Sequence, residues 1–393
     1  MKKILALVLA LCMVFALCAC GAKTEAPAAE APAAEAPAAE APAAEAPAAE
    51  APAFKVAMIT DYGDITDQSF NQTTYEGCKE FCDENSIEFK YYKPAGDSTA
   101  ERVAMVDAAV ADGFNVIVMP GFAFGETVVQ TVELYPDVYF VALDVSQGDL
   151  GDFVLPENVF CAVYQEELCG YMAGYAAVKL GYTKLGFLGG MAVPAVVRYG
   201  YGFVQGADAA AAELGLTDVT MNYAYGNQFF GDADITAAMD TWYSAGTEVV
   251  FACGGGIYTS AAEAAAKVGG KVIGVDVDQA AIIDGDYGEG MTVTSAMKGL
   301  SATVKSVLGD LILNDAWSNY AGKVSTLGLI GEDPEANFVQ LPVASTQFAE
   351  GFTEADYTAL VAAMFNGEIT VSSDIEAEPA VTAITVDYQG NIK

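Results

Sequence analysis

Histidine is absent from all 393 residues of the chain. Histidine is the commonest general base in enzymes and the commonest protein ligand of transition metals. Its absence excludes a Ser-His-Asp triad and a Cys-His nucleophile pair. The usual transition-metal ligand is therefore missing, and we also expect no metal site and no cofactor.

Positively charged residues are scarce, with 17 Lys and Arg against 53 Asp and Glu, which gives a formal net charge of −36. A field this negative repels the phosphate backbones of DNA and RNA, so we expect no nucleic-acid partner. The length and the 53% share of hydrophobic residues allow a sizeable core, which we expect to be divided between two domains.

Cysteine is too sparse to form a covalent framework. Three of the eight cysteines lie within the first 20 residues, and the other five contain no C-x-x-C pair. An odd number without zinc-ligand spacing argues against a complete disulfide set and against a zinc site. We predict that these five are mostly small buried hydrophobic residues. They are Cys78, Cys82, Cys161, Cys169 and Cys253.

The first 20 residues have the features of a secretory signal. Two lysines precede an apolar run from 4 to 17, which is too short to span a membrane. The run ends in Leu17-Cys18-Ala19-Cys20, which resembles the lipobox of bacterial lipoproteins. We expect a signal peptide at 1–19, a lipid on Cys20, and a protein anchored on the outer side of the bacterial cell membrane. An ordinary signal peptide with incidental cysteines is the alternative.

A repeat of Glu-Ala-Pro-Ala-Ala follows, from Glu25 to Ala53. Proline at every fifth position prevents a continuous helix, and like charges at fixed spacing extend the chain. We expect residues 20–53 to form a lipidated linker, which at roughly 3 Å per residue reaches on the order of 90 Å.

From Lys55 onward, short apolar segments alternate with segments of helical periodicity, a pattern typical of βαβ units in a parallel sheet. In the first half we expect strands at 55–60, 87–92, 115–120 and 138–144, with helices at 69–84, 99–112 and 125–135. In the second half we expect strands at 184–188, 219–224, 248–252 and 271–275, with helices at 166–180, 198–214, 233–245, 258–268 and 297–313.

This repetition predicts an α/β protein with a type I periplasmic-binding-protein fold. Two Rossmann-like parallel-sheet lobes are expected, joined by a three-segment hinge and closing over a cleft at the strand ends. We expect the N-terminal lobe to comprise 54–162 and 296–322, and the C-terminal lobe to comprise 163–295 and 323–393.

Aspartates follow several of the expected strands. Asp61, Asp144 and Asp276 can accept hydrogen bonds from ligand hydroxyl or amino groups, or they can cap helices and turns. We favour the ligand role for Asp61 and Asp276, and capping for Asp67. A calcium site at Asp61, Asp64 and Asp67 is a less favoured alternative, because their spacing does not match an EF-hand.

Phe70 and Phe251 occupy corresponding places in the two lobes, each near a change from strand to helix. They are either core residues or, if both face the cleft, a two-sided clamp for a flat ring. The glycines at 254–256 lack the Gly-Lys-Ser/Thr that completes a phosphate loop, so we interpret them as permitting a close approach of backbone to ligand. Lys298, expected early in helix 297–313, is a candidate ligand donor beside the hinge.

Several motifs between residues 55 and 300 occur in an order that resembles the basic membrane lipoprotein (BMP) family. This purine nucleoside receptor-like family consists of ABC-transporter substrate-binding lipoproteins. The motifs are Thr60-Asp61 with Gly63, Asp67-Gln68-Ser69-Phe70-Asn71-Gln72, Gly186-Phe187-Leu188-Gly189-Gly190, Gly202-Phe203 with Gly206, Val250-Phe251 with Gly254 to Gly256, Ile273-Gly274-Val275-Asp276-Val277-Asp278-Gln279, and Thr294-Ser295 with Lys298.

The resemblance implies a site for a purine nucleoside. In that family two phenylalanines sandwich the purine, which places Phe70 and Phe251 on its two faces. The family pattern also implies that Asp61 and Asn71 reach the edge of the base.

The resemblance further implies that Asp276 and Lys298 hold the ribose hydroxyls, with Gly256 nearby and Asp144 at the opposite rim. Arg198 departs from the family pattern, because relatives often carry an aromatic residue at this position. The role of Arg198 therefore stays open at the level of sequence.

Our hypothesis from sequence is a monomeric binding protein, not an enzyme. It captures a nucleoside between its lobes and delivers it to a membrane permease driven by a separate ATPase. The acidic cleft suits nucleosides better than nucleotides. One alternative is a nucleoside or glycoside hydrolase that uses paired carboxylates such as Asp61 and Asp276. Another alternative is a ligand sensor or adhesion protein displayed on the surface.

Overall fold

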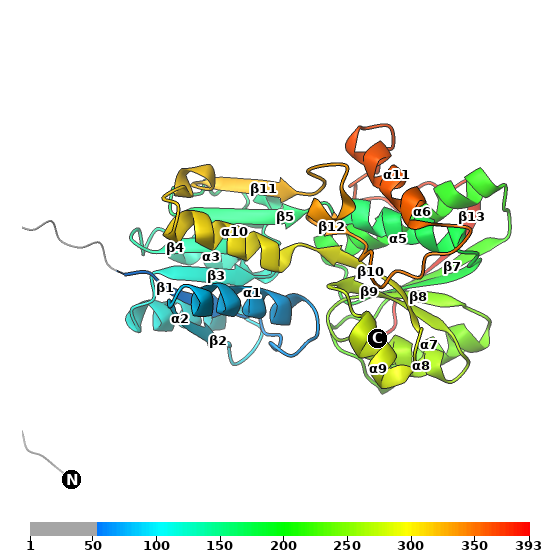
Figure 1. Ribbon diagram of the computed structural model, residues 1–393. Coiled ribbons are helices and arrows are strands. Elements are labelled where there is room, and N and C mark those ends of the chain that lie inside the picture. The colour runs from blue at the N-terminus through cyan, green and yellow to red at the C-terminus, as the bar shows by residue number, and fades with distance from the viewer. Residues whose placement is uncertain (1–52) are drawn as a thin grey trace, which may run out of the picture. The chain divides into compact units, whose positions relative to one another are not determined.

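The computed structural model describes residues 53–393 (Figure 1). The expected signal peptide at 1–19, the lipid on Cys20 and the linker up to residue 52 lie outside the described residues. Within the described part of the chain, no helix is both long and apolar enough to cross a membrane.

Six parallel strands form the first sheet, in the order β11-β5-β4-β3-β1-β2. They are β1 (Lys55–Ile59), β2 (Glu88–Tyr92), β3 (Val116–Pro120), β4 (Tyr139–Leu143), β5 (Val159–Tyr164) and β11 (Lys323–Leu327). Alternate residues of β1 pack into different clusters, with Val56 and Met58 in one and Ala57 and Ile59 in the other. Side chains that alternate along a strand point to opposite faces, so both faces of this sheet are covered.

Helices on the two faces supply this cover. One face carries α1 (Phe70–Glu84) and α10 (Leu300–Ile312), and the other carries α2 (Thr99–Ala111), η1 (Phe122–Phe124), α3 (Gly125–Thr131) and α4 (Gln147–Leu150). We call this sheet and its helices the N-terminal lobe. The five cysteines in the described residues are free and buried, which confirms their prediction as small hydrophobic residues.

The second sheet has seven strands in the order β12-β10-β9-β8-β6-β7-β13. They are β6 (Lys184–Gly189), β7 (Val219–Tyr225), β8 (Val249–Cys253), β9 (Lys271–Asp276), β10 (Thr292–Lys298), β12 (Val339–Gln340) and β13 (Ile384–Asn391). Only β12 is antiparallel to its neighbour. The order β7-β6-β8-β9-β10 repeats β2-β1-β3-β4-β5, so the repetition expected from sequence exists in the topology.

Two long helices, α5 (Glu166–Lys179) and α6 (Pro194–Leu214), pack on one face of the second sheet. The opposite face carries α7 (Ala233–Ser244), α8 (Tyr258–Ala266) and α9 (Ala280–Tyr287). The remaining helices are η2 (Trp317–Asn319), η3 (Pro334–Ala336) and α11 (Glu354–Phe365). We call the second sheet and its flanking helices the C-terminal lobe; Figure 1 shows the two sheets side by side with helices around each.

Three connections join the lobes, after β5, after β10 and after β11. This arrangement confirms the expected pair of parallel-sheet lobes with a three-segment hinge. Ligands of such open α/β sheets bind beyond the carboxyl ends of the strands.

Two expected boundaries are wrong. Residues 292–298 form strand β10, and the helix expected from 297 begins only at Leu300, because this segment is buried between β9 and β12. The expected C-terminal lobe included 323 onward, but β11 pairs with β5 of the first sheet. This edge strand is half exposed and carries little apolar signal, which explains why the pattern missed it.

Candidate functional site

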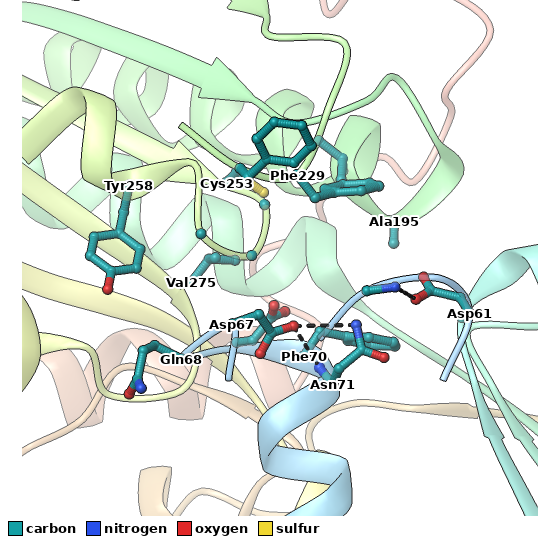
Figure 2. A pocket seen from close by; sticks show the side chains of 18 of the residues that line it. Asp61, Asp67, Gln68, Phe70, Asn71, Ala195, Phe229, Cys253, Tyr258 and Val275 are labelled. Atoms are coloured by element: carbon teal, nitrogen blue, oxygen red, sulfur yellow. Dashed lines mark hydrogen bonds between the residues drawn. The ribbon is translucent and has the colours of Figure 1, made fainter. Parts of the chain in front are cut away.

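A cavity of about 540 Å³ opens between the strand ends of the two lobes (Figure 2). This volume lies within the roughly 300–1,000 Å³ typical of small-molecule sites. Seven of the eight expected ligand residues line it, namely Asp61, Phe70, Asn71, Asp144, Gly256, Asp276 and Lys298. The eighth, Phe251, does not.

Asp61 follows β1 after one intervening residue, Thr60, and lies at one end of the cavity. Its Oδ1 accepts backbone N–H bonds from Tyr62 at 2.7 Å and Gly63 at 2.8 Å, which fixes the carboxylate. Burial raises the pKa of Asp61 above its ordinary value, although these two hydrogen bonds act in the opposite direction. The loop geometry thus holds an acceptor group at the cavity wall.

Asp67 caps α1, as expected. Its carboxylate accepts backbone N–H bonds from Ser69, Asn71 and Gln72 at 2.9 to 3.0 Å, which satisfies free donors at the helix start. Asp64 instead forms an exposed ion pair with Lys93 at 2.8 Å. Within 53–393 no cluster of three acidic or cysteine side chains is arranged to hold a metal ion, which argues against the calcium alternative.

Phe70 and Asn71 are the first two residues of α1, and both face the cavity. The Phe70 ring centroid lies 4.7 Å from the Lys298 ammonium, a cation–π distance. The Asn71 amide Nδ2 donates to Asp67 at 3.2 Å, but its Oδ1 is buried without a hydrogen-bond partner. A buried acceptor left unpaired is costly, so this oxygen favours a ligand that brings a donor.

Phe251 is a core residue, which corrects the expected clamp. It lies in the middle of β8, is fully buried, and packs against Phe187 and Phe203 with ring centroids 5.5 and 5.3 Å away. Side chains alternate along a strand, and this one points toward the α5–α6 face instead of the strand end.

Phe229, and not Phe251, is a phenylalanine of the C-terminal lobe that lines the cavity. It follows β7 in a loop, lines the cavity, and lies across from Phe70 (Figure 2). Its carbonyl oxygen accepts the N–H of Gly256 at 2.9 Å, which ties the loop to the end of β8. The signal that was missed is the pair Phe229-Phe230 beside a glycine, in the loop that follows β7.

The glycines at 254–256, expected to permit a close approach to a ligand, all line the cavity, and Gly254 together with Gly190 also makes room for Phe229. A Cβ on Gly190 would lie 2.4 Å from a Phe229 ring carbon, and one on Gly254 would lie 3.0 Å from the same ring. Gly254 and Gly255 also have φ values of 151° and 52°, which side-chain-bearing residues rarely adopt. The loop at 254–256 therefore leaves space for the aromatic ring of Phe229.

Lys298 is the last residue of β10, whereas we expected it in a helix. Its ammonium lies 2.6 Å from Asp144, 3.5 Å from Glu166 and 3.8 Å from Asp276. Burial alone would lower the pKa of Lys298, but these carboxylates raise it above its ordinary value. Lys298 is therefore a charged donor shared among three acceptors.

Asp144 and Asp276 mark the ends of β4 and β9 and adopt φ values of 58° and 63°. Such left-handed conformations are uncommon outside glycine and concentrate at functional sites. Burial raises the pKa of Asp144 to about 6 and also raises the pKa of Asp276. Asp144 Oδ1 is buried and unpaired, so it is a second acceptor without a donor.

Two hydrogen bonds cross the cleft beside this group. Ser69 Oγ of the N-terminal lobe donates to Asp276 Oδ2 at 2.6 Å, and Gln279 Nε2 donates to the Gln68 carbonyl at 3.0 Å. Sequence reasoning missed both contacts because each joins residues more than 200 positions apart. They hold the two lobes together at the cavity floor.

Arg198 does not line the cavity. Its Nε donates to Glu166 Oε2 at 2.7 Å, and the Glu166 side chain is completely buried. Glu166 in turn contacts Lys298, which lines the cavity, so Glu166 connects Arg198 to the cavity wall.

Proteins of known name are similar to this chain in sequence. The "ABC transporter nucleoside-binding protein BmpA" of Lactococcus lactis subsp. cremoris is 29% identical over 238 residues, which cover 57% of this chain and 64% of that protein. "Basic membrane protein B" of Borreliella burgdorferi is 28% identical over 284 residues, covering 70% of this chain and 78% of that protein.

Solved structures share the fold. An ABC transporter solute-binding protein from Conexibacter woesei superposes with a TM-score of 0.63 at 21% identity, covering 82% of this chain and 99% of that one. The myo-inositol-binding protein of Caulobacter gives a TM-score of 0.52 at 16% identity, covering 80% and 97%. These similarities establish the type I periplasmic-binding-protein fold.

Residues 54–331 match the family described as "ABC transporter substrate-binding protein PnrA-like", also called Bmp. The match covers both sheets except for the C-terminal strands, and it includes every cavity residue discussed above. Together with the shared fold and the similar sequences, this match shows that the chain belongs to the Bmp family of PnrA-like ABC transporter substrate-binding proteins.

Proposed function

We propose that this protein binds a purine nucleoside in the cavity between its lobes and delivers it to an ABC importer. The observation that carries the proposal is the pair Phe70 and Phe229, which come from opposite lobes and border the same cavity (Figure 2). A flat ring held between two aromatic faces gains roughly 0.5–1.5 kcal/mol per contact beyond its buried area. The nucleoside-binding relative of Lactococcus supports the same ligand class.

The base-binding end of the cavity is rich in acceptors. Asp61 is a fixed carboxylate there, and Asn71 Oδ1 is buried and unpaired. Both can accept N–H bonds from the edge of a purine. This end therefore suits a base that presents N–H groups, such as guanine or hypoxanthine.

The opposite end suits a sugar. Lys298 can donate to hydroxyl oxygens, while Asp276 and the unpaired Asp144 Oδ1 can accept hydroxyl protons. Vicinal ribose hydroxyls both donate and accept, so they satisfy all three side chains together. Free bases lack these groups and should bind more weakly.

The charge of the cavity favours an uncharged ligand. Five aspartates line it, at positions 61, 64, 67, 144 and 276, and Lys298 is the only cation among the lining residues in the described part of the chain. Because Lys298 is already shared among carboxylates, a phosphate group would meet net negative charge. Nucleosides should therefore bind more tightly than nucleotides.

The same proposal covers the protein's place in the cell. A lipid on Cys20 and the linker up to residue 53 would hold a monomeric binding domain on the outer side of the membrane, where closure around the ligand precedes transfer to a permease and its ATPase. No bond in the ligand is broken. Hinge closure is the usual response of this fold to its ligand.

Isothermal titration calorimetry and thermal shift with inosine, guanosine, adenosine, adenosine monophosphate, adenine, ribose and myo-inositol test the proposal. We expect the nucleosides to raise the melting temperature and to bind best. Tighter binding of adenosine monophosphate than of adenosine would contradict the charge argument. Release of free hypoxanthine from inosine at turnover would favour the hydrolase, and no response to any nucleoside would favour the sensor or adhesion alternative.

A further inference from the structure

Glu166 and Arg198 form a buried ion pair that the proposed ligand contacts do not use. The Glu166 side chain is fully buried and that of Arg198 is 15% exposed, yet neither residue lines the cavity. Glu166 Oε2 is 2.7 Å from Arg198 Nε, and its Oε1 is 3.5 Å from Lys298 Nζ. The pair therefore lies directly behind Lys298, which is part of the cavity wall.

The charges around Lys298 explain why a second cation is needed. Three carboxylates, of Asp144, Glu166 and Asp276, surround one ammonium group. Arg198 supplies a strong hydrogen bond to Glu166, which leaves Lys298 nearest to Asp144 at 2.6 Å. Without Arg198, Glu166 would be a buried carboxylate with Lys298 as its only cationic neighbour, and it would draw the ammonium away from the cavity.

The backbone holds this arrangement rigidly. Helix α5, which begins at Glu166, and helix α6, which carries Arg198, touch through glycines. A Cβ on Gly170 or Gly174 would lie 2.1 Å from a carbonyl oxygen of α6, and one on Gly202 would lie 2.1 Å from that of Glu167. Helices in such close contact cannot shift without losing it, so the distance between the two charged residues is fixed.

Glu166 and Lys298 both lie beside connections between the two lobes. Glu166 follows the first connection between the lobes and Lys298 ends the strand before the second. Lys298 belongs to the C-terminal lobe, whereas its nearest carboxylate, Asp144, belongs to the N-terminal lobe. The ammonium position thus depends on groups from both sides of the hinge.

We propose that Arg198 is a positioning residue, which by pairing with Glu166 keeps the Lys298 ammonium directed at Asp144 and at the hydroxyl groups of the bound ligand. This inference rests on the proposed function, in which Lys298 donates to the sugar. It assigns a role to Arg198, whose role the sequence alone leaves open. Arg198 acts through Glu166 and touches no ligand itself.

The test compares inosine with 2′,3′-dideoxyinosine, which lacks the two hydroxyl groups, by calorimetry on the wild type and on Arg198→Met. The wild type should prefer inosine. Arg198→Met should lose about tenfold in inosine affinity, a typical coupling between contacting residues, and almost none in dideoxyinosine affinity. A role in stability alone would weaken both ligands equally, and that result would overturn the inference.

Two further variants keep the test decisive if Arg198→Met folds poorly. In the double variant Glu166→Gln with Arg198→Met, the uncompensated charge is gone, so we expect the preference for inosine to return. Arg198→Lys should restore it in part, because it keeps the positive charge but not the guanidinium geometry. If neither variant prefers inosine over dideoxyinosine more strongly than Arg198→Met does, the mechanism is wrong.

Lys179→Met is the matched control. Lys179 of α5 pairs with Glu213 of α6 at 2.9 Å, so it joins the same two helices but lies outside the cavity lining. Its loss should leave the inosine preference unchanged. If the wild type itself binds both ligands equally, the role of Lys298 in the proposed function fails and the inference fails with it. If the wild type and Arg198→Met discriminate equally, only the inference fails.

Discussion

The ring of Phe229 lies against the backbone of Gly190, so closely that a Cβ at position 190 would be 2.4 Å from a ring carbon. Real Cβ atoms do not approach this closely, so Gly190→Ala must displace the ring. We expect this variant to weaken inosine binding about tenfold, because the stacking face contributed by the C-terminal lobe would move. Calorimetry measures the affinity.

Gly285→Ala is the control for that variant. Gly285 lies within α9, and no atom lies within 4 Å of a Cβ built there. Alanine in a helix interior is more favourable than glycine by up to about 1 kcal/mol, so this variant should keep its affinity and its stability. Unchanged binding in Gly190→Ala would show that Phe229 is not part of the binding surface.

Phe229 and Phe251 should respond oppositely to substitution. Phe229→Ala removes a half-buried ring at the cavity and should weaken purine nucleoside binding about tenfold with little effect on melting temperature. Phe251→Leu changes the shape of a fully buried core residue and should lower stability by about 1 kcal/mol while leaving affinity intact. Phe70→Ala should resemble Phe229→Ala. The opposite pattern for Phe229 and Phe251 would restore the clamp expected from sequence.

Buried strands of this protein could be predicted from the sequence, whereas the edge strand β11 could not. Buried parallel strands are continuous apolar runs, so β1, β3, β4 and β8 could be located from sequence, as could the aspartates that follow them. Strand β11 is a half-exposed edge strand, and its pairing with β5 joins residues that are 163 positions apart, such as Lys323 and Phe160. No local pattern carries that information.

Phe251 shows the same limit at the level of one side chain. Its place within a strand could be predicted, but whether it faces the cavity or the helices depends on strand register and on the sheet's neighbours. Phe229 lies in a loop without periodicity, and its position is set by contact with glycines of two other segments. The acceptor groups Asp61 and Asp276 were found because Asp61 lies two residues after β1 and Asp276 ends β9, and both strands were located correctly.

Removal of the Ser69 hydroxyl should open the ligand-free protein. Ser69 Oγ donates to the buried carboxylate of Asp276 across the cleft, and hydrogen bonds to charged groups contribute about 1.5–3 kcal/mol. Ser69→Ala should therefore lower the ratio of closed to open molecules about tenfold or more. Small-angle X-ray scattering of the ligand-free protein should show a larger radius of gyration, which ligand should reverse.

Thr131→Val separates this effect from simple loss of a buried hydroxyl. Thr131 Oγ1 donates to the Thr127 carbonyl within α3 at 2.7 Å, and both residues are fully buried in the N-terminal lobe. This variant should lose some stability but keep the scattering profile of the wild type. Identical profiles for wild type and Ser69→Ala would mean that the Ser69–Asp276 hydrogen bond does not govern closure.

Nucleoside affinity should fall in mild acid because of Asp144. Burial raises the pKa of its carboxyl from 3.8 to about 6; Lys298 lowers this value, and the charges of Glu166 and Asp276 raise it. A ligand hydroxyl that donates to Asp144 requires the carboxylate form. Inosine affinity should therefore be constant above about pH 7 and should decrease, by up to about tenfold per pH unit, as pH falls through about 6.

The stability of the ligand-free protein should change with the opposite sign. Between about pH 4 and 6 the folded protein retains a proton on Asp144 that the unfolded chain has lost, so this residue's contribution to stability decreases as pH rises through that window. Asp144→Asn should remove both trends, whereas Glu167→Gln should leave the affinity trend intact. Glu167 has its pKa raised by burial to about 7 but does not line the cavity. Affinity that is flat from pH 5 to 7 in the wild type would show that Asp144 accepts no hydrogen bond from the ligand.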